Sequence, residues 1–475
     1  MLFNSFGFLC FFIPGALIYA ALRARHGWRV ASQVWLLLLS LAFYSYSSWR
    51  ELPLLAGSIL FNWAMGRLVA RDTLAATTRR WLIFGGIAAN LIFLGSFKYV
   101  SFLLSLLDPL LGITVAAPTW KFPLGISFFT LNQVMYLVDC SEGILAPSSL
   151  FDHAAFVAFF PYLVSGPLAR AKQMTQQFRS VDARPITAKD VAQGLAFFCI
   201  GLFKKTVFAD SLLRIADIAY QNPAAASTAD AWISVLAYSL QIYFDFSGYS
   251  DMAVGLAKMM GFDIPFNFNA PYKSRSIIEF WQRWHISLSN FITTYLYTPI
   301  LRAFGGRATV SKAAVASILA MTISGLWHGA AWGFVLWGMS HGVALAVNQL
   351  WRKKLKVKMP AWLGWAITFT FVTVVEIFFR APSLPIAGAV LRHLLPSGSD
   401  MFHVQAVNNI SLETLSYLIP AALALPVALI GRSSQEVVAA LEPRGRIAVG
   451  YAAMGLYALA SMNSIIATSF VYFGF

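Results

Sequence analysis

Charged residues are scarce in this chain, and their scarcity indicates its class. Only 12% of the 475 residues are charged, whereas 58% are hydrophobic. Soluble proteins carry charge on about a quarter of their residues, so this composition excludes a water-soluble or a disordered chain. Because a spanning helix needs about 20 apolar residues, the sequence predicts an all-α integral membrane protein with about 11 or 12 transmembrane helices.

Acidic residues and paired cysteines are also few. The 20 Asp and Glu against 35 Lys and Arg give a net charge of +15. The basic residues lie in short loops between apolar runs, as the positive-inside rule describes, and form no single patch for a nucleic acid. The three cysteines are far apart and show no metal-binding or disulfide spacing. We therefore expect no nucleic-acid partner and no bound metal.

The chain contains no fixed-period repeat, low-complexity tract or polar linker. We therefore expect one polytopic membrane domain over residues 1–475. Basic loops at residues 23–29, 67–80, 170–189 and 352–358 are expected on the cytoplasmic side. This orientation places both termini outside.

The succession of long apolar runs is interrupted between Gly261 and Lys312. An S-x-x-E capping pattern beginning at Ser276 predicts the start of a helix there. On that helix Trp281, Trp284 and His285 are spaced by three and four residues, so we expect them to occupy neighbouring positions. The mixed aromatic and basic composition favours a short re-entrant or interfacial helix over a spanning one.

A second unusual stretch, from Ala313 to Trp351, contains 39 residues without a single Asp, Glu, Lys or Arg. As a helix it would be roughly 58 Å long, nearly two membrane crossings, so it must double back. Its glycine-rich centre contains His328. An ionisable residue within a membrane span is a functional candidate. The alternative is that His328 only bonds a carbonyl or the hydroxyl of Ser324, one turn earlier.

The polar sequence FDFSGYSD follows another apolar run. Asp245 and Tyr249 share a helix face there. Since buried carboxylates need partners, we expect Asp245 to bind an Asn or Arg of the irregular segment, and contact with substrate is the alternative. Asn132 and Gln133, in a span that is otherwise apolar, have the same two interpretations.

Three long motifs occur in order, namely QIYFDFSGYSDMAVGLAKMMGF, NAPYKSRSIIEFWQRWHISLS and GLWHGAAWGFVLWGMSHG. Together they resemble the membrane-bound O-acyltransferase family, in particular its bacterial branch with the alginate O-acetyltransferase membrane subunit. The resemblance runs from about Pro123 to Trp351, so residues 121–351 are expected to carry the family core. It implies a helical fold around a central tunnel open to both membrane faces.

By this resemblance, His328 matches the essential histidine of the family, His285 its second characteristic position, and His341 a recurrent position. His328 and His285 are thus the expected catalytic residues. Further candidates for the substrate, the tunnel or their support are Trp327, Trp284, Arg283, Ser324, Asp245, Tyr249 and Asn269.

A neutral imidazole, with an unperturbed pKa near 6.5, is suited to act as a base at neutral pH. We expect His328 to deprotonate the acceptor hydroxyl as it attacks acetyl-CoA or another acyl thioester, with no permanently bound cofactor. Lys273, Arg275 and Arg283 are expected to attract the phosphates of coenzyme A, or else only to set the topology.

The position of His328 in the outer half of the membrane and the cytoplasmic basic residues together predict that an acetyl group is taken from acetyl-CoA inside and delivered outward. With the resemblance, this predicts O-acetylation of an extracellular polysaccharide at a bacterial inner membrane. The expected partners are membrane lipids and a periplasmic acetyltransferase or the polysaccharide-synthesis machinery. A lipid or protein acceptor is the alternative within the family. The alternative from another class is a polysaccharide or small-molecule transporter, but carriers commonly contain paired internal repeats, which this sequence lacks.

Overall fold

The computed structural model describes residues 2–112, 121–180, 184–355, 357–396, 404, 412–442, 445–462 and 470. Within these residues the chain forms helices and no β-strand, which confirms the all-α class. The fold divides into two compact units. Unit 1 contains Met1–Phe198 and Ala253–Pro265, and unit 2 contains Cys199–Met252 and Phe266–Phe475. The expectation of a single domain stays a prediction.

The N-terminal part of the chain, which belongs to unit 1 as far as residue 198, folds into helices over most of its described residues. They are α1 (Phe6–Arg23), α2 (Arg29–Ser48), η1 (Trp49–Glu51), α3 (Leu52–Val69), α4 (Ala76–Lys98), α5 (Val100–Leu111), α6 (Ile126–Ser141), α7 (Leu150–Ala158), α8 (Phe160–Leu163), α9 (Ala171–Arg179) and α10 (Ala188–Phe203).

The remaining helices belong to unit 2, except that the end of α12 lies in unit 1. They are η3 (Lys204–Ala209), α11 (Asp210–Gln221), η4 (Pro223–Ala225), α12 (Thr228–Met259), η5 (Pro271–Lys273), α13 (Ile277–Arg283), α14 (Ile286–Phe291), η6 (Ile292–Tyr297), α15 (Thr298–Ala303), α16 (Val310–His328), α17 (Trp332–Leu350), η7 (Trp351–Leu355), α18 (Ala361–Arg380), α19 (Leu384–His393), α20 (Leu412–Ile430), α21 (Ser434–Ala439) and α22 (Gly445–Ser461). The segments η3, η6 and η7 are π-helical.

Six described helical segments are long and apolar enough to cross a membrane, which supports a multi-pass membrane protein. They are Phe6–Arg23, Trp49–Val69, Ala76–Lys98, Ala188–Gln221, Val310–His328 and Ala361–Arg380. The expected number of 11 or 12 crossings stays a prediction. Much of the last apolar run, beyond residue 462, lies outside the described residues.

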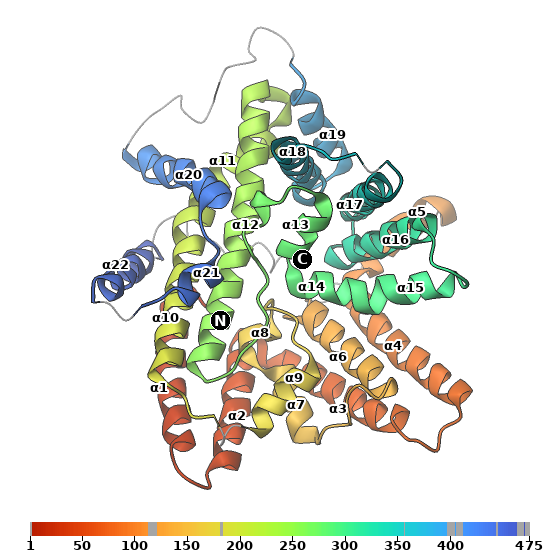
Figure 1. Ribbon diagram of the computed structural model, residues 1–475, viewed down its shortest axis with the longest axis vertical. Coiled ribbons are helices and arrows are strands. Elements are labelled where there is room, and N and C mark those ends of the chain that lie inside the picture. The colour runs from red at the N-terminus through yellow and green to blue at the C-terminus, as the bar shows by residue number, and fades with distance from the viewer. Residues whose placement is uncertain are drawn as a thin grey trace. The chain divides into compact units, whose positions relative to one another are not determined.

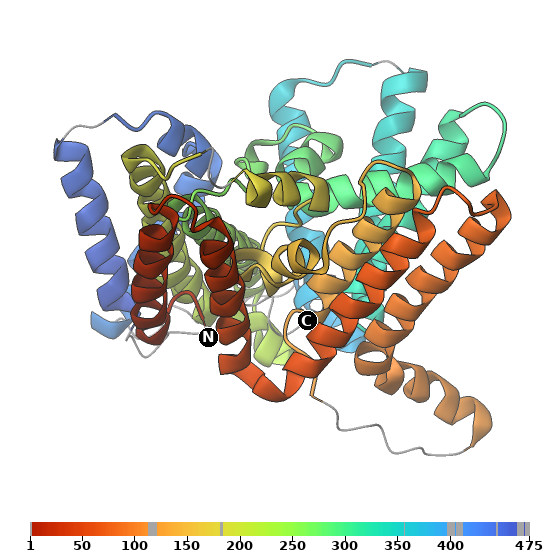
Figure 2. The same ribbon diagram turned by 90° about the horizontal axis from the view of Figure 1, so that it is seen from below.

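In unit 1, polar side chains join α3, α4 and α6, and α3 and α4 run side by side in Figure 2, where they are orange. The side-chain amides of Asn62 and Asn90 bind each other through two hydrogen bonds of 3.0 and 2.7 Å. Gln133 of α6 bonds the Oγ of Ser58 at 3.4 Å and the Nε2 of His153 at 3.0 Å. Gln133 is therefore an interhelical hydrogen-bonding residue, one of its two predicted roles.

In unit 2, α16 and α17 form the helical hairpin that the charge-free stretch predicts, and α18 packs against α17 (Figure 1). Glycines bring the two backbones of the hairpin into contact. A Cβ atom on Gly325 would lie 2.2 Å from the carbonyl oxygen of Phe334, and one on Gly338 would lie 2.3 Å from that of Met321. The small residues thus allow an approach that a methyl group would prevent.

Candidate functional site

His328 is the last residue of α16, where the hairpin turns toward α17. Only 3% of its surface is exposed. Its imidazole ring packs against the rings of Trp327, Trp337 and Phe379, with centroid distances of 4.8, 5.2 and 5.3 Å. The predicted histidine is therefore held inside an aromatic enclosure built from α16, α17 and α18.

His341 of α17 lies beside the same enclosure. The indole Nε1 of Trp281 donates a hydrogen bond to its Nδ1 at 3.3 Å. Trp337 packs against His341 at 4.8 Å and against Trp281 at 5.9 Å. Trp337 also contacts His328. The indole of Trp337 is therefore a neighbour of both His328 and His341.

Glu376 of α18 completes this group, although the sequence motifs did not indicate it. Its Oε1 accepts a hydrogen bond from the indole Nε1 of Trp337 at 3.3 Å, and the residue is 3% exposed. We call Trp281, His328, Trp337, His341 and Glu376 the His328 cluster. One signal could have pointed to Glu376: it is the only acidic residue of the apolar helix α18, and an ionisable residue within a membrane span is a functional candidate by default.

The helix predicted at Ser276 does begin there, because the Ser276 side chain accepts a hydrogen bond from the backbone N–H of Glu279. However, α13 ends at Arg283, and His285 has a left-handed conformation with φ 42°. The expectation that Trp281, Trp284 and His285 share one helix is therefore wrong. The chain turns between the first residue and the other two, so helical spacing does not apply to them.

His285 is buried and packs edge-on against Phe246 of α12, with ring centroids 4.7 Å apart. A positive φ at a residue other than glycine is uncommon, and here hydrogen bonds hold the turn. The carbonyl of Asn267 accepts from the N–H of Ile286, and its side-chain Oδ1 accepts from Ser287. Trp284 packs against an aromatic group formed by Tyr243, Phe268, Tyr272 and Phe280. Phe280 joins this group to Trp281 and His341 of the His328 cluster.

Arg283 and Asn269 bind each other in the described structure. The N–H of Asn269 donates to the carbonyl of Arg283 at 2.9 Å, and the guanidinium of Arg283 donates to the Asn269 carbonyl at 3.3 Å. The same guanidinium forms an ion pair with Glu279 at 2.9 Å. These contacts stabilise the irregular segment locally.

Asp245 forms an ion pair with a residue outside the irregular segment. Its partner is Lys205 in the π-helical segment η3, at 2.7 Å, and Lys205 also binds Asp210 at 2.9 Å. All three residues are almost fully buried. Tyr249, one turn after Asp245, packs against Phe470 at 4.8 Å. The sequence missed this pairing because neither Lys205 nor Asp210 lies in the three motifs.

Ser324 does not make the bond to His328 that the alternative interpretation of this histidine offered. Its Oγ is buried and has no hydrogen-bond partner among the described residues. Among the described residues, no group of three His, Cys, Asp or Glu side chains is arranged to hold a metal ion.

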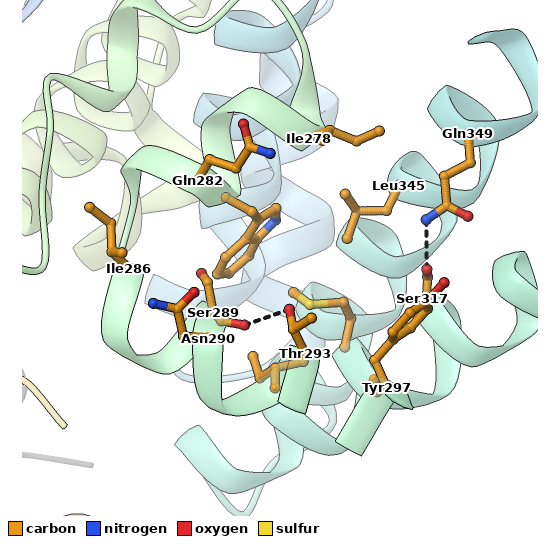
Figure 3. A pocket seen from close by; sticks show the side chains of 14 residues that line it. Ile278, Gln282, Ile286, Ser289, Asn290, Thr293, Tyr297, Ser317, Leu345 and Gln349 are labelled. Carbon is orange, nitrogen blue, oxygen red and sulfur yellow. Dashed lines mark hydrogen bonds between the residues drawn. The ribbon is translucent and has the colours of Figure 1, made fainter. Parts of the chain in front are cut away.

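A cavity of about 480 Å³ lies beside the cluster within unit 2, and Trp281 forms part of its wall. In Figure 3, Gln282 and Asn290 lie on one side, and Leu345 and Gln349 on the other. Its other lining residues are Ile278, Ile286, Ser289, Ile292, Thr293, Tyr297, Ser317, Ala320 and Met321.

The cavity lining combines apolar side chains with amides and hydroxyls and contains no charged residue. Gln349 donates to the hydroxyl of Ser317 at 2.9 Å. Burial raises the pKa of Tyr297, so its phenol stays a neutral hydrogen-bond donor at neutral pH. The lining therefore suits an uncharged ligand with both apolar and amide or hydroxyl groups.

Chemically, the enclosure holds an imidazole away from bulk water, and Trp337 lies between this imidazole and Trp281 of the cavity wall. Such a base can remove a proton from a hydroxyl group when the substrate brings that group within hydrogen-bonding reach. Aromatic rings around it exclude water, which would otherwise compete with the hydroxyl as acceptor of the transferred group.

A family model described as "MBOAT, membrane-bound O-acyltransferase family" matches residues 8–381. The chain is 37% identical to the "Peptidoglycan O-acetyltransferase" of Helicobacter pylori, over 88% of this chain and 86% of the relative. It is 38% identical to the "Probable alginate O-acetylase AlgI" of Pseudomonas aeruginosa, over 84% of this chain and 76% of the relative. It is 30% identical to the "Teichoic acid D-alanyltransferase" of Streptococcus thermophilus, over 49% of this chain and 58% of the relative.

Proposed function

Because this chain belongs to the membrane-bound O-acyltransferase family, we propose that it transfers acetyl groups for the O-acetylation of a cell-envelope polysaccharide. The chain is an O-acyltransferase of the membrane, as its family is. The polysaccharide acceptor is supported by relatives whose names specify peptidoglycan and alginate. The single observation that carries the proposal is the match over residues 8–381, which includes the whole His328 cluster.

The proposed donor is acetyl-CoA from the cytoplasm, and the proposed location is the bacterial inner membrane with both termini in the periplasm. The basic loops support this orientation through the positive-inside rule. The uncharged cavity beside Trp281 suits the acyl and amide portion of the thioester. The phosphates would then lie outside it, near Lys273 and Arg275, because Arg283 is already paired with Glu279.

In the proposed reaction, His328 accepts the proton of the acceptor hydroxyl as the hydroxyl oxygen attacks the thioester carbonyl carbon. The C–S bond then breaks, and the imidazolium returns its proton to the leaving thiolate. Atoms and charge therefore balance without a metal or a redox step. The aromatic enclosure of His328 supports this role because it orients the ring and excludes water.

His285 is proposed as the second catalytic residue. It is buried in the turn between α13 and α14, beside Phe246. A group at this position contributes to catalysis if it contacts the donor or the acceptor. The left-handed backbone conformation of His285 supports the proposal, because strained conformations cluster at functional sites.

The proposed protein partner is a periplasmic acetyltransferase or another component of polysaccharide synthesis, which receives the acetyl group and completes its delivery. A D-alanyl group is a second candidate for the transferred group, favoured by the match to the teichoic acid enzyme over about half of the chain. A lipid or protein acceptor is the remaining alternative within the family.

The experiment uses purified full-length protein in proteoliposomes, with acetyl-CoA as donor and short peptidoglycan or alginate fragments as acceptors. Wild-type protein is expected to release coenzyme A, and to form O-acetyl esters once the partner acetyltransferase is added, and His328→Ala should abolish both while remaining folded. His393→Ala, which changes a histidine in α19, is the matched control and should retain activity. Normal transfer by His328→Ala would overturn the mechanism, and transport of the fragments without acetyl transfer would favour a carrier.

A further inference from the structure

Glu376 is a buried acidic residue that has no role in the reaction proposed above. It is the only acidic residue in α18 and is 3% exposed. Arg380, one turn later on the same helix, forms an ion pair with Asp217 instead and lies over the rings of Tyr220 and Tyr238. Burial of a carboxyl group costs free energy unless hydrogen bonds compensate for the lost water. The hydrogen-bond partner of Glu376 therefore indicates what stabilises this residue in its buried position.

That partner is the indole of Trp337, which donates to Oε1 of Glu376 at 3.3 Å. An indole has only one N–H group, so this bond determines which way its polar edge faces. The other carboxyl oxygen, Oε2, is buried and has no hydrogen-bond partner among the described residues. Among the described residues, the contact between Glu376 and Trp337 is therefore the one hydrogen bond of both side chains, and ring contacts add to it at Trp337.

The oriented indole is in direct contact with His328. The two rings lie 5.2 Å apart and are nearly perpendicular, at 84°. Phe379, three residues after Glu376 on α18, packs against both rings at 5.3 Å. One face of α18 thus contributes a hydrogen bond to Trp337 and an aromatic contact to His328.

We propose that Glu376 is a positioning residue for acyl transfer, which fixes the indole of Trp337 and through it the plane of the His328 imidazole. This inference rests on the proposed function, in which His328 is the base. Proton transfer requires the ring nitrogen to point at the acceptor hydroxyl, and small misplacements of a catalytic group lower rates strongly. Glu376 acts through Trp337 and does not contact the reacting atoms itself.

A purely structural role predicts different behaviour. In that case the bond from Trp337 to Glu376 only joins α17 to α18, as polar residues commonly join membrane helices. Its loss would then lower the thermal stability of the protein and the amount that folds, but would leave the turnover of the folded enzyme unchanged.

The experiment compares four single variants of the full-length protein and one double variant. Glu376→Met removes the acceptor oxygen at similar length, Glu376→Gln keeps an acceptor oxygen, and Trp337→Phe removes the donor. Thr373→Val is the matched control, because Thr373 is a buried residue of the same helix face whose hydroxyl has no described partner. Release of coenzyme A from acetyl-CoA is measured for each variant together with its melting temperature.

We expect Glu376→Met to lower kcat by roughly 10- to 100-fold with KM nearly unchanged, Glu376→Gln to restore most of kcat, and Thr373→Val to match the wild type. Combining Glu376→Met with Trp337→Phe should lower kcat no further than the more impaired single variant, because both changes break one bond. Multiplied losses in the double variant, or a normal kcat in Glu376→Met, would overturn the proposal.

A second measurement needs no substrate, so it separates this inference from the proposed function. The rate at which diethyl pyrocarbonate modifies His328, located by mass spectrometry, should change in Glu376→Met and Trp337→Phe and stay constant in Thr373→Val. If the wild type transfers no acetyl group but this rate changes, only the proposed function fails. An unchanged rate in Glu376→Met contradicts the positioning role, whatever the activity.

Discussion

The indole of Trp281 donates its only N–H to Nδ1 of His341 at 3.3 Å. Since an N–H can donate only to a nitrogen that carries no proton, the neutral His341 ring must hold its proton on Nε2. That Nε2 is buried and has no hydrogen-bond partner among the described residues. Trp281 therefore selects one tautomer of a histidine that shares Trp337 with His328.

Trp281→Phe should disturb this selection while keeping an aromatic ring in the cavity wall. Because one neutral hydrogen bond contributes about 0.5–1.5 kcal/mol, we expect kcat for acyl transfer to fall by about 3- to 10-fold. Trp232→Phe is the matched control, since it also removes an indole bond, to the carbonyl of Leu394 at 3.0 Å. Steady-state kinetics of both variants test this, and equal activity in the two would contradict a role for the His341 tautomer.

Leu345→Trp should fill part of the cavity beside Trp281, because Leu345 belongs to its lining. If the cavity holds the acyl thioester, the added ring raises KM for acetyl-CoA or abolishes transfer. Leu319→Trp, at an exposed position of α16, adds the same volume outside the cavity and should leave the kinetics unchanged. Equal KM values for wild type and Leu345→Trp would show that the donor binds elsewhere.

Gly338→Ala should destabilise the hairpin of α16 and α17. The new methyl group would lie 2.3 Å from the carbonyl oxygen of Met321, and a backbone atom cannot move aside as a flexible side chain can. Overpacking typically costs about 1–3 kcal/mol, so we expect a clear fall in melting temperature. Gly388→Ala in α19 meets nothing within 4 Å and should instead be neutral or stabilising, by up to about 1 kcal/mol.

Lys205→Met should be strongly destabilising, because it leaves the carboxylates of Asp210 and Asp245 buried without their shared ammonium group. Removing one partner of a buried ion pair typically costs about 3–5 kcal/mol. The exposed Lys354 provides the control, since Lys354→Met should change stability by less than about 0.5 kcal/mol. Adding Asp245→Asn to Lys205→Met should recover part of the loss, and thermal unfolding in detergent measures all three variants.

The hairpin of α16 and α17 could be predicted because two independent signals agree there. A charge-free stretch longer than one membrane crossing has to reverse, and the glycines near His328 supply the place. The start of α13 was equally predictable, because Ser276 caps the helix through a local hydrogen bond. Both features depend on residues that are close together in the sequence.

The other contacts of the site join residues that are far apart in the sequence, so the spacing of residues within a motif does not predict them. The helical relation of Trp281, Trp284 and His285 failed because long-range hydrogen bonds from Asn267 support a turn within that spacing. Glu376 lies 39 residues beyond the indole that binds it, and the pairing of Lys205 with Asp245 joins residues 40 positions apart. Only the tertiary packing brings these groups together.

The contact between glycine backbones in the hairpin of α16 and α17 also limits how the site can be regulated. His328 ends one helix of this hairpin and Trp337 lies on the other, so the glycine contacts that join the two helices also limit the distance between the backbones of these residues. The cavity beside this hairpin has a wall of a different kind, since residues of the π-helical segment η6 line it. If His328 is the base, as proposed, a substrate has to reach the end of α16 for the reaction to occur.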